Sequence, residues 1–329
     1  MKEKQEERDF AEVLAEIFKA DPLPIADLYR LSDMKAEEAA LFWAGWTAVS
    51  PERRQTIVRH LADISEDNFM VDFAPIFIPS LQDALPEIRV AALDGLWDST
   101  DLRLIPTIIK LMQDDPAEQV RVAAAGSLGH YVLLAEWGQL PERILPNLVE
   151  TMLAAYEGGE TAVAVRRVLL EGLGAADNPR ITSLISAAYE SRDMAMQLSA
   201  VFAMGNSADR RWTVTVMGEM ESPYEEMRAE AARAAGTIGN SDFVSKLAEL
   251  AYDEDLAVQT AAITALGQIG GDEVQRILDE MLEDPEIAED DELLEVVEAA
   301  MEEAAMMAGD FEFADFLFGD DDDDEDDDL

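Results

Sequence analysis

The stretch VQTAAITALG, residues 258–267, is one of six similar ten-residue segments in this chain. The other five are IRVAALDGLW from residue 88, VRVAAAGSLG from 120, VRRVLLEGLG from 165, MQLSAVFAMG from 196 and MRAEAARAAG from 227. The last four segments begin 31 residues apart, whereas a gap of 45 residues before the third of the six predicts an insertion within residues 130–143. A fixed period of this length is typical of proteins built from stacked repeats.

Each period contains two predicted helices, for example residues 241–253 followed by residues 256–271. The second helix of a period follows an acidic or proline-containing turn and ends near Gly or Asn, which are start and stop signals for helices. No segment alternates polar and apolar residues as a half-buried strand would. Because one helix pair cannot bury its apolar face alone, neighbouring pairs must stack. We therefore predict an all-α fold, a right-handed α-solenoid of about seven or eight helix pairs.

The repeated segments resemble the HEAT-like repeats of bacterial proteins, the type that is also found in phycobilin lyases. The resemblance covers about residues 70 to 270 well and the flanking residues more loosely. It concerns the fold, because such repeats serve many different partners. We expect an N-terminal helical cap in residues 1–34, a HEAT-like α-solenoid in residues 35–308, and a Phe-rich acidic tail in residues 309–329 whose last part is disordered.

The composition argues against several classes of site. The chain has no cysteine, which excludes disulfides, thiolate metal sites and cysteine nucleophiles. Its two histidines, His60 and His130, are not followed by glutamate, so the iron-binding pattern of deoxyhypusine hydroxylase, an enzyme built on the same repeats, is absent. We predict no catalytic residue, no metal and no cofactor. No apolar stretch is long enough for a membrane helix, and we expect a cytoplasmic protein.

The net charge of −47 is unevenly placed along the sequence. Residues 277–329 contain 25 acidic residues and no lysine or arginine. A field of this sign repels nucleic acids and anionic lipids and attracts basic proteins. We therefore predict a basic protein partner, with no direct nucleic-acid binding and no membrane insertion. Adaptation to high salt is an alternative explanation of the acidity, and the oligomeric state stays open.

Helical geometry sorts the positions of each ten-residue segment. With 100° per residue, positions 1, 4, 5 and 8 form a packed face, and positions 3 and 7 point the opposite way. We predict that positions 3 and 7 line a concave groove for a partner. They are Val90, Asp94, Val122, Gly126, Arg167, Glu171, Leu198, Phe202, Ala229, Arg233, Thr260 and Thr264. In the alternative interpretation, Leu198 and Phe202 simply pack against the next layer.

Arginine recurs at position 2 of these segments, and we interpret it as structural. It is expected to bond to acidic residues in adjacent turns, for example Arg121 to Asp115, rather than to bind a ligand. Gln197 and Gln259 replace the arginine in two repeats, which weakens the expected ladder there.

The C-terminal segment DFEFADFLFGDDDDDEDDDL, residues 310–329, has three possible roles. Gly309 is expected to interrupt the preceding helix, and residues 320–328 are expected to be disordered because nine acidic side chains repel one another. The aromatic part could cap the end of the solenoid, dock on a partner, or occupy the chain's own groove. Its apolar residues are Phe311, Phe313, Phe316, Leu317 and Phe318.

We predict a non-enzymatic scaffold, either an adaptor or an assembly chaperone, that captures a basic protein with its groove and its acidic C-terminal end. The resemblance implies one alternative, a phycobilin-lyase-like subunit that handles a chromophore, with Arg167 and Arg233 as the cations for the propionates of a tetrapyrrole. A second alternative is an acidic mimic of nucleic acid that acts on a DNA- or RNA-binding protein.

Overall fold

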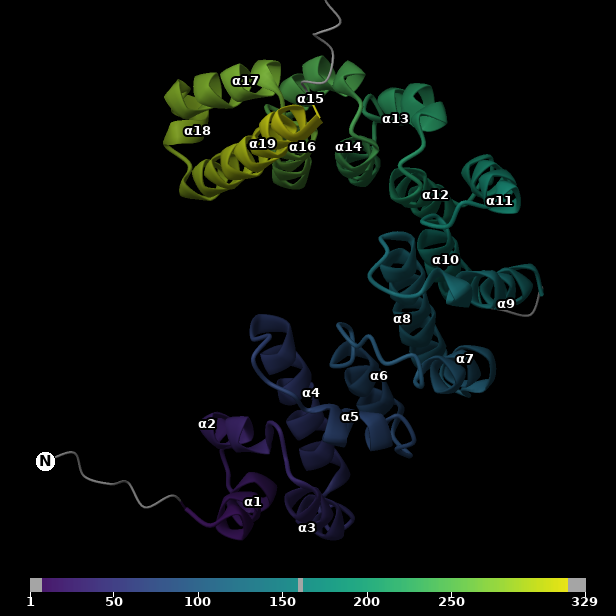
Figure 1. The fold of residues 1–329 in the computed structure, drawn as a ribbon, viewed down its shortest axis with the longest axis vertical. Coiled ribbons are helices and arrows are strands. Elements are labelled where there is room, and N and C mark those ends of the chain that lie inside the picture. The colour runs from purple at the N-terminus through teal and green to yellow at the C-terminus, as the bar shows by residue number, and fades with distance from the viewer. Residues whose placement is uncertain (1–7, 159–161, 319–329) are drawn as a thin grey trace, which may run out of the picture. The chain divides into compact units, whose positions relative to one another are not determined.

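The computed structural model describes residues 8–158 and 162–318, and only the backbone of residues 286 and 307–318. All regular structure in these residues is helical (Figure 1), so the protein has the all-α, solenoid-type fold that the repeat predicts. The chain forms two compact units, Met1–Leu169 and Leu170–Leu329, called unit 1 and unit 2 below. Within the described residues, no helix is both long enough and apolar enough to span a membrane.

Unit 1 consists of short helices that follow one another in antiparallel pairs. They are α1 (Phe10–Lys19), α2 (Ile25–Leu28), α3 (Ala36–Trp46), α4 (Pro51–Asp67), α5 (Ala74–Ser80), α6 (Pro86–Asp94), α7 (Ile105–Asp114), α8 (Glu118–Glu136) and α9 (Leu145–Glu157), with 3-10 turns at Tyr29–Leu31 and Glu142–Ile144. The helix α10 (Val163–Leu173) crosses the boundary into unit 2. The predicted insertion lies at the end of α8, which it lengthens to 19 residues, and in the turn that follows.

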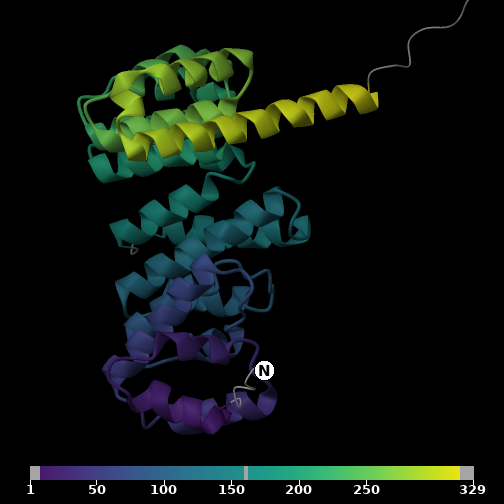
Figure 2. The same cartoon turned by 90° about the vertical axis from the view of Figure 1, so that its left-hand side faces the viewer.

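Unit 2 repeats the same pairing with a more regular period. Its helices are α11 (Pro179–Tyr189), α12 (Met194–Asn206), α13 (Thr213–Glu219), α14 (Glu225–Ile238), α15 (Val244–Leu250), α16 (Leu256–Ile269), α17 (Asp272–Glu283), α18 (Pro285–Ala288) and α19 (Asp291–Phe318), with 3-10 turns at Arg210–Trp212 and Ser241–Phe243. The last helix continues through Gly309, so the expected interruption at that residue is wrong. Figure 2 shows α19 running past the other helices of this unit.

The predicted start and stop signals act as expected. The Asp255 carboxylate accepts a hydrogen bond from the Val258 N–H at 3.2 Å and so caps α16, and Asp193 caps α12 through the Ala195 N–H at 3.0 Å. Gly239 ends α14 with a φ of 65°, a left-handed conformation that favours glycine. The starts of α12 and α16 are thus capped by an aspartate at the residue just before each helix.

The second helices of unit 2 approach one another very closely, because glycine faces alanine at each contact. A Cβ atom on Gly205 would lie 2.8 Å from the Cα of Ala234, and one on Gly236 would lie 2.9 Å from the Cα of Ala265. Both distances are shorter than real Cβ contacts. The glycine at position 10 of each repeat therefore sets the spacing of α12, α14 and α16.

Two of the recurrent arginines, Arg89 and Arg228, form the predicted structural ladder. Arg166 does not follow it, because its buried Nε atom has no hydrogen-bond partner among the described residues and its guanidinium lies over the Tyr156 ring at 4.8 Å. Arg89 donates two hydrogen bonds to the Asp115 carboxylate, at 2.8 and 2.7 Å, and a third to the carbonyl of Asp83. In unit 2, Arg228 makes the equivalent pair of bonds to Asp253, both at 2.8 Å. The expected pair of Arg121 and Asp115 also exists, but the acceptor is the backbone carbonyl of Asp115, at 2.7 Å. Arg89 and Arg228 thus connect the turn before their own helix to the next repeat.

The predicted N-terminal cap, residues 1–34, contains the helices α1 and α2. Phe42 and Trp46 of α3 are buried, and their rings stack with centroids 4.8 Å apart. The guanidinium of Arg53 donates to the carbonyl of Ile17 at 2.7 and 2.9 Å, which joins α4 to α1. The role of this region as a cap stays a prediction.

Candidate partner-binding surfaces

Unit 2 has a hollow of about 700 Å³ on the surface of its second helices, called the unit 2 groove below. Side chains of α12, α14 and α16 line it, together with the first turn of α19. Four predicted groove residues lie in it, namely Phe202, Arg233, Thr260 and Thr264. The 31-residue period brings them together, because each occupies position 3 or 7 of its repeat.

The groove combines apolar and hydroxyl side chains. Phe202 of α12 and Leu256 at the start of α16 are large apolar residues that stay exposed to solvent. Thr260 and Thr264 are one helical turn apart on α16 and are half-buried. Small residues such as Ala257 and Ala261 leave the space between them open. Such a surface can accommodate an apolar side chain of a ligand, and its threonine hydroxyls can form hydrogen bonds with polar groups of the same ligand.

One charged pair lies in the unit 2 groove. Arg233 donates to the Glu230 carboxylate at 3.0 Å, and both residues belong to α14. Burial raises the pKa of Glu230 above its ordinary value, and the charge of Arg233 partly opposes this rise. Arg233 itself is exposed, so it can meet a ligand while Glu230 orients it.

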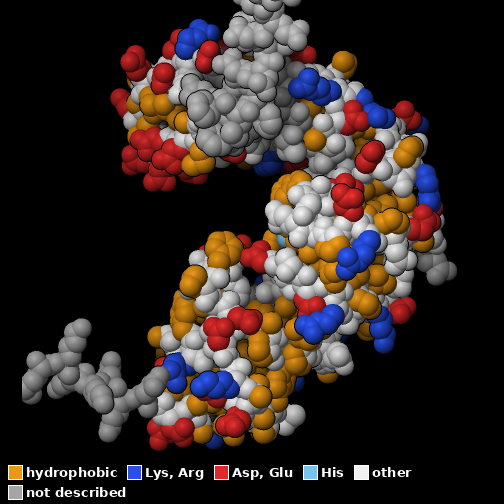
Figure 3. All heavy atoms as spheres, in the orientation of Figure 1, with side chains coloured by type: hydrophobic (Ala, Val, Ile, Leu, Met, Phe, Trp, Pro, Cys, Tyr) orange, Lys and Arg blue, Asp and Glu red, His pale blue; other side chains and the backbone are white. Residues whose placement is uncertain are grey.

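An acidic patch adjoins the groove at the turn between α18 and α19. Figure 3 shows acidic side chains gathered over this turn. Its four consecutive acids are exposed, and the fourth, Glu292, also lines the groove. They are Glu289, Asp290, Asp291 and Glu292. The groove therefore ends in a strongly negative field that attracts cations.

Three other predicted groove residues of unit 2 are not among those that line this hollow. Glu171 is half-buried and accepts a hydrogen bond from the Ser199 hydroxyl at 2.5 Å, so it connects α10 to α12. Leu198 is half-buried on α12, which leaves both of its interpretations open. Ala229 is 3% exposed, and its expected place in a groove is wrong. Its helix α14 lies between α12 and α16, and a single methyl group does not reach past them.

The predicted groove residues of unit 1 lie on three helices, α6, α8 and α10. Val90, Val122 and Gly126 are half-buried on α6 and α8. Arg167 is half-buried on α10. Asp94 lines a pocket that is described with the further inference below. Of the tail residues, the structure describes only the backbone, which is helical for Phe311, Phe313, Phe316, Leu317 and Phe318, while residues 319–329 lie outside the described part of the chain.

The sequence interpretation missed two exposed aromatic residues, Phe69 and Trp97. Trp97 stands at position 10 of the first repeat, where the later repeats have the glycine that packs against the next helix. Phe69 lies in the short linker between α4 and α5. The signal in the sequence was the departure of Trp97 from the repeat, together with the apolar pair Phe69–Met70 in the linker.

The indole ring of Trp97 rests on His130 of α8. The two rings stack with centroids 4.2 Å apart and planes inclined by 29°. The Nδ1 atom of His130 is buried and has no hydrogen-bond partner among the described residues. Burial lowers the pKa of His130, and the nearby Asp98 carboxylate offsets part of that effect. The folded protein therefore favours the neutral imidazole.

This lowered pKa predicts a loss of stability at acidic pH. The unfolded chain protonates His130 near its ordinary pKa of about 6.5, whereas the folded chain resists protonation, so this residue's contribution to the free energy of unfolding decreases as the pH falls below that value. We expect the difference in unfolding free energy between the unmodified chain and His130→Phe, which keeps an aromatic ring, to change between pH 7.5 and pH 5. Urea titrations at several pH values measure it, and a difference independent of pH would contradict the assignment.

Within the part of the chain that the structure describes, no three histidine, cysteine or acidic side chains are grouped so that they could hold a metal ion.

Comparison with known proteins identifies the repeats. Residues 104–134 match the HEAT repeat family, and residues 214–302 match a family described as HEAT repeats. The first range spans α7 and most of α8, and the second runs from α13 into α19. No curated protein sequence matches the chain.

Several solved structures resemble the chain at low sequence identity. Human deoxyhypusine hydroxylase in complex with glycerol is 15% identical with a TM-score of 0.36, over 90% of this chain and 95% of its own. The Escherichia coli protein YibA is 16% identical with a TM-score of 0.41, over 74% of this chain and 96% of its own. A chain from a structure of Kap95p with RanGDP is 15% identical with a TM-score of 0.40, over 90% of this chain and 40% of its own. The sequence matches therefore show that the chain contains HEAT repeats in residues 104–134 and 214–302.

Proposed function

We propose that the chain is a non-enzymatic scaffold, an adaptor or an assembly chaperone, that binds a protein partner in the unit 2 groove. The observation that carries this proposal is the shared location of Phe202, Arg233, Thr260 and Thr264, which line one hollow. All four occupy position 3 or 7 of their repeats, and helical geometry turns these positions away from the packed face. The HEAT repeats matched in residues 214–302, a range that includes Arg233, Thr260 and Thr264, are in keeping with a protein-binding role.

The chemistry of the groove suits an amphipathic helix or an extended peptide. Phe202 and Leu256 offer apolar contacts, and the hydroxyls of Thr260 and Thr264 offer hydrogen bonds. A helix places an apolar side chain toward such a surface every three or four residues. The exposed Arg233 can pair with one acidic or carbonyl group of the ligand and fix its register.

The charge of the chain favours a partner that is basic outside its apolar anchor. The acidic turn before α19 adjoins the groove, and residues 320–328 add nine acids at the C-terminus. Opposite charge increases association rates and hardly changes dissociation rates when the charges lie at the rim of an interface. A chain that ends at Phe318, and so keeps the whole of α19, is expected to associate more slowly at low salt and equally fast at high salt.

Site-specific photo-crosslinking tests the groove and captures the partner in the same experiment. Benzoylphenylalanine replaces Phe202 or Thr264 in the full chain, and it replaces Val214 in a control. Val214 is 84% exposed on α13, outside the groove. We expect the same basic protein to be crosslinked from both groove positions in lysate of the source organism and not from position 214. Crosslinks from position 214 alone, or none from the groove, would contradict the proposal.

A further inference from the structure

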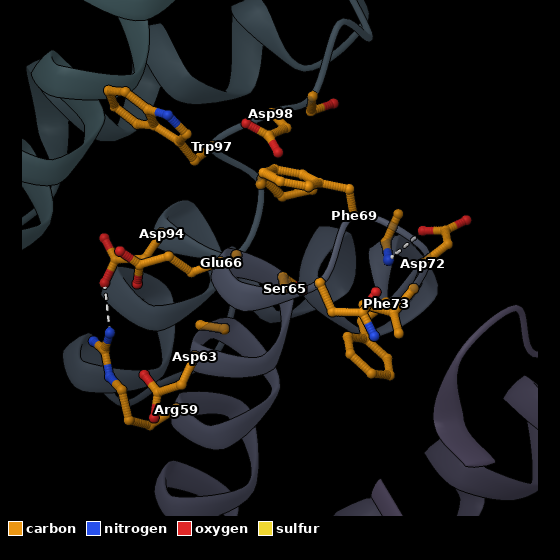
Figure 4. Close-up of a pocket in the computed structure, with 17 residues that line it drawn as sticks. Arg59, Asp63, Ser65, Glu66, Phe69, Asp72, Phe73, Asp94, Trp97 and Asp98 are labelled. Carbon is orange, nitrogen blue, oxygen red and sulfur yellow. Dashed lines mark hydrogen bonds and ion pairs between the residues drawn. The ribbon is translucent and has the colours of Figure 1, made fainter. Parts of the chain in front are cut away.

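Unit 1 has a second hollow, of about 770 Å³, that the predicted groove does not include. It lies between α4, the linker 68–73 and the residues that follow α6, and is called the unit 1 pocket below (Figure 4). Its lining is aromatic and acidic, which differs from the mixed lining of the unit 2 groove. All of its residues belong to unit 1.

Two large aromatic side chains border the unit 1 pocket and remain in solvent. Phe69 is 82% exposed and Trp97 is 52% exposed. An exposed apolar group beside a hollow is typical of a binding surface, because the folded chain gains nothing from it in the free state. In the view of Figure 4, the Asp98 carboxylate lies between the two rings.

Hydrogen bonds hold this linker in place. The Met70 N–H donates to the Asn68 side-chain oxygen at 2.9 Å, which forms a turn around Phe69. The Asp72 N–H donates to the Ser32 hydroxyl at 2.9 Å, and the Asp72 carbonyl accepts from the Asp33 N–H at 2.9 Å. A surface that is ordered before binding loses less conformational entropy when a ligand arrives.

Contacts with neighbouring residues also hold Trp97 in position. Its backbone N–H donates to the carbonyl of Asp94 at 3.1 Å, and its ring lies against His130. One face of the indole is therefore occupied by the imidazole, while half of the side chain stays accessible to a ligand.

The pocket carries a large excess of negative charge. Five acidic residues line it, and they are Asp63, Glu66, Asp72, Asp94 and Asp98. One base lines it as well, Arg59, which is bound to Asp94 at 2.8 Å. The Asp72 carboxylate accepts a hydrogen bond from the Ala74 N–H at 2.8 Å, and Asp63 lies 3.8 Å from the Nδ1 atom of His60. Glu66 and Asp98 are therefore the carboxylates that we expect to meet a cationic ligand.

We propose that the unit 1 pocket binds an arginine side chain from an extended basic segment of a protein partner. A guanidinium is planar, so it stacks on the faces of aromatic rings, and its N–H groups fit two carboxylate oxygens at once. Lysine has a compact ammonium group without a flat face. The negative charge of the pocket repels acidic side chains and gives neutral side chains no ionic attraction. The inference depends on residues of unit 1 alone and does not require a ligand in the unit 2 groove.

The test follows the indole N–H signal of Trp97 by NMR in the full chain at pH 7.5. The chain has five tryptophans, and Trp97→Phe identifies the relevant signal. The probe is the peptide acetyl-Gly-Ser-Arg-Ser-Gly-amide, with lysine and citrulline versions at the central residue. We expect a saturable shift with the arginine peptide, binding about threefold weaker or more with lysine, and no saturation with neutral citrulline.

Matched variants distinguish binding in the unit 1 pocket from nonspecific attraction to the negative charge of the chain. Glu66→Gln with Asp98→Asn is expected to abolish the saturable shift. Glu295→Gln with Glu298→Gln removes the same charge from exposed positions of α19 and is expected to leave it unchanged. Phe69→Ala is expected to weaken binding about threefold. The four other indole signals report whether each variant remains folded.

Three results would overturn the inference. The Trp97 signal could stay fixed at saturating arginine peptide, or citrulline could bind as tightly as arginine. The third is a shift with free arginine amide but none with the peptide, which would make the pocket a small-molecule site. None of these results bears on crosslinking from the unit 2 groove, so the two proposals fail separately.

Discussion

Replacement of Arg89 by alanine is expected to lower the free energy of unfolding by about 3–5 kcal/mol. Arg89 and Asp115 are 9% and 5% exposed in their side chains, and two short hydrogen bonds join them. Without the guanidinium, the Asp115 carboxylate stays buried with no cation, and the Asp83 carbonyl loses its donor. A buried charge without its partner is among the most destabilising changes in a protein interior. Urea denaturation followed by circular dichroism measures the effect.

Arg103→Ala is the matched control. Arg103 also pairs with an aspartate, Asp101, but its side chain is 90% exposed. Water replaces the lost interaction there, and we expect little change in stability. The double variant Arg89→Met with Asp115→Leu, which removes both charges, is expected to be more stable than Arg89→Ala. Equal losses for Arg89→Ala and Arg103→Ala would show that the ladder has no special structural role.

Gly205→Ala is expected to destabilise unit 2 by about 1–3 kcal/mol, although alanine is the better helix former. The new methyl group would lie 2.8 Å from the Cα of Ala234. Backbone is on the other side of the contact, so no side chain can rotate away, and α12 and α14 must separate. The change therefore disturbs the spacing that the next repeat depends on.

Gly218→Ala makes the same substitution where there is room. Gly218 lies in α13, and a Cβ atom there would have no neighbour within 4 Å. We expect it to raise stability by up to about 1 kcal/mol through helix propensity alone. Thermal or urea unfolding of both variants measures the contrast. A stabilising Gly205→Ala would contradict the close-packed stacking described for unit 2.

The sequence predicts the fold well because the features that define a repeat can be read from each short segment of the chain. Period, caps and the face of each helix are local properties, and they predicted α16 and its neighbours. Phe202 and Thr264 line one hollow, and their role in binding stays a prediction. The same geometry failed at Ala229, because exposure depends on side-chain size and on the neighbouring helices as well as on direction. It also failed at Gly309, since one glycine costs a helix only about 1 kcal/mol and the flanking residues favour the helix.

Local sequence patterns could not predict the unit 1 pocket. Phe69 and Trp97 are far apart in the sequence, and they border one hollow only because α4 and α6 pack side by side. The Ser32 hydroxyl accepts a hydrogen bond from the Asp72 N–H, and the Asp33 N–H donates one to the Asp72 carbonyl. Both residues are still further away in sequence, and they position the linker. No periodicity encodes such a tertiary arrangement. Trp97 in place of the usual glycine and the apolar pair Phe69–Met70 were the visible signs in the sequence.

The most direct test of the central claim is hydrogen–deuterium exchange on the complex with the partner that photo-crosslinking identifies. The claim is that the second helices of unit 2 form the binding surface. We predict slower exchange in α12, α14 and α16 and in the first turn of α19 when the partner is bound, with α13 and α15 unchanged. Protection confined to α13 and α15, or no change anywhere in unit 2, would contradict the account.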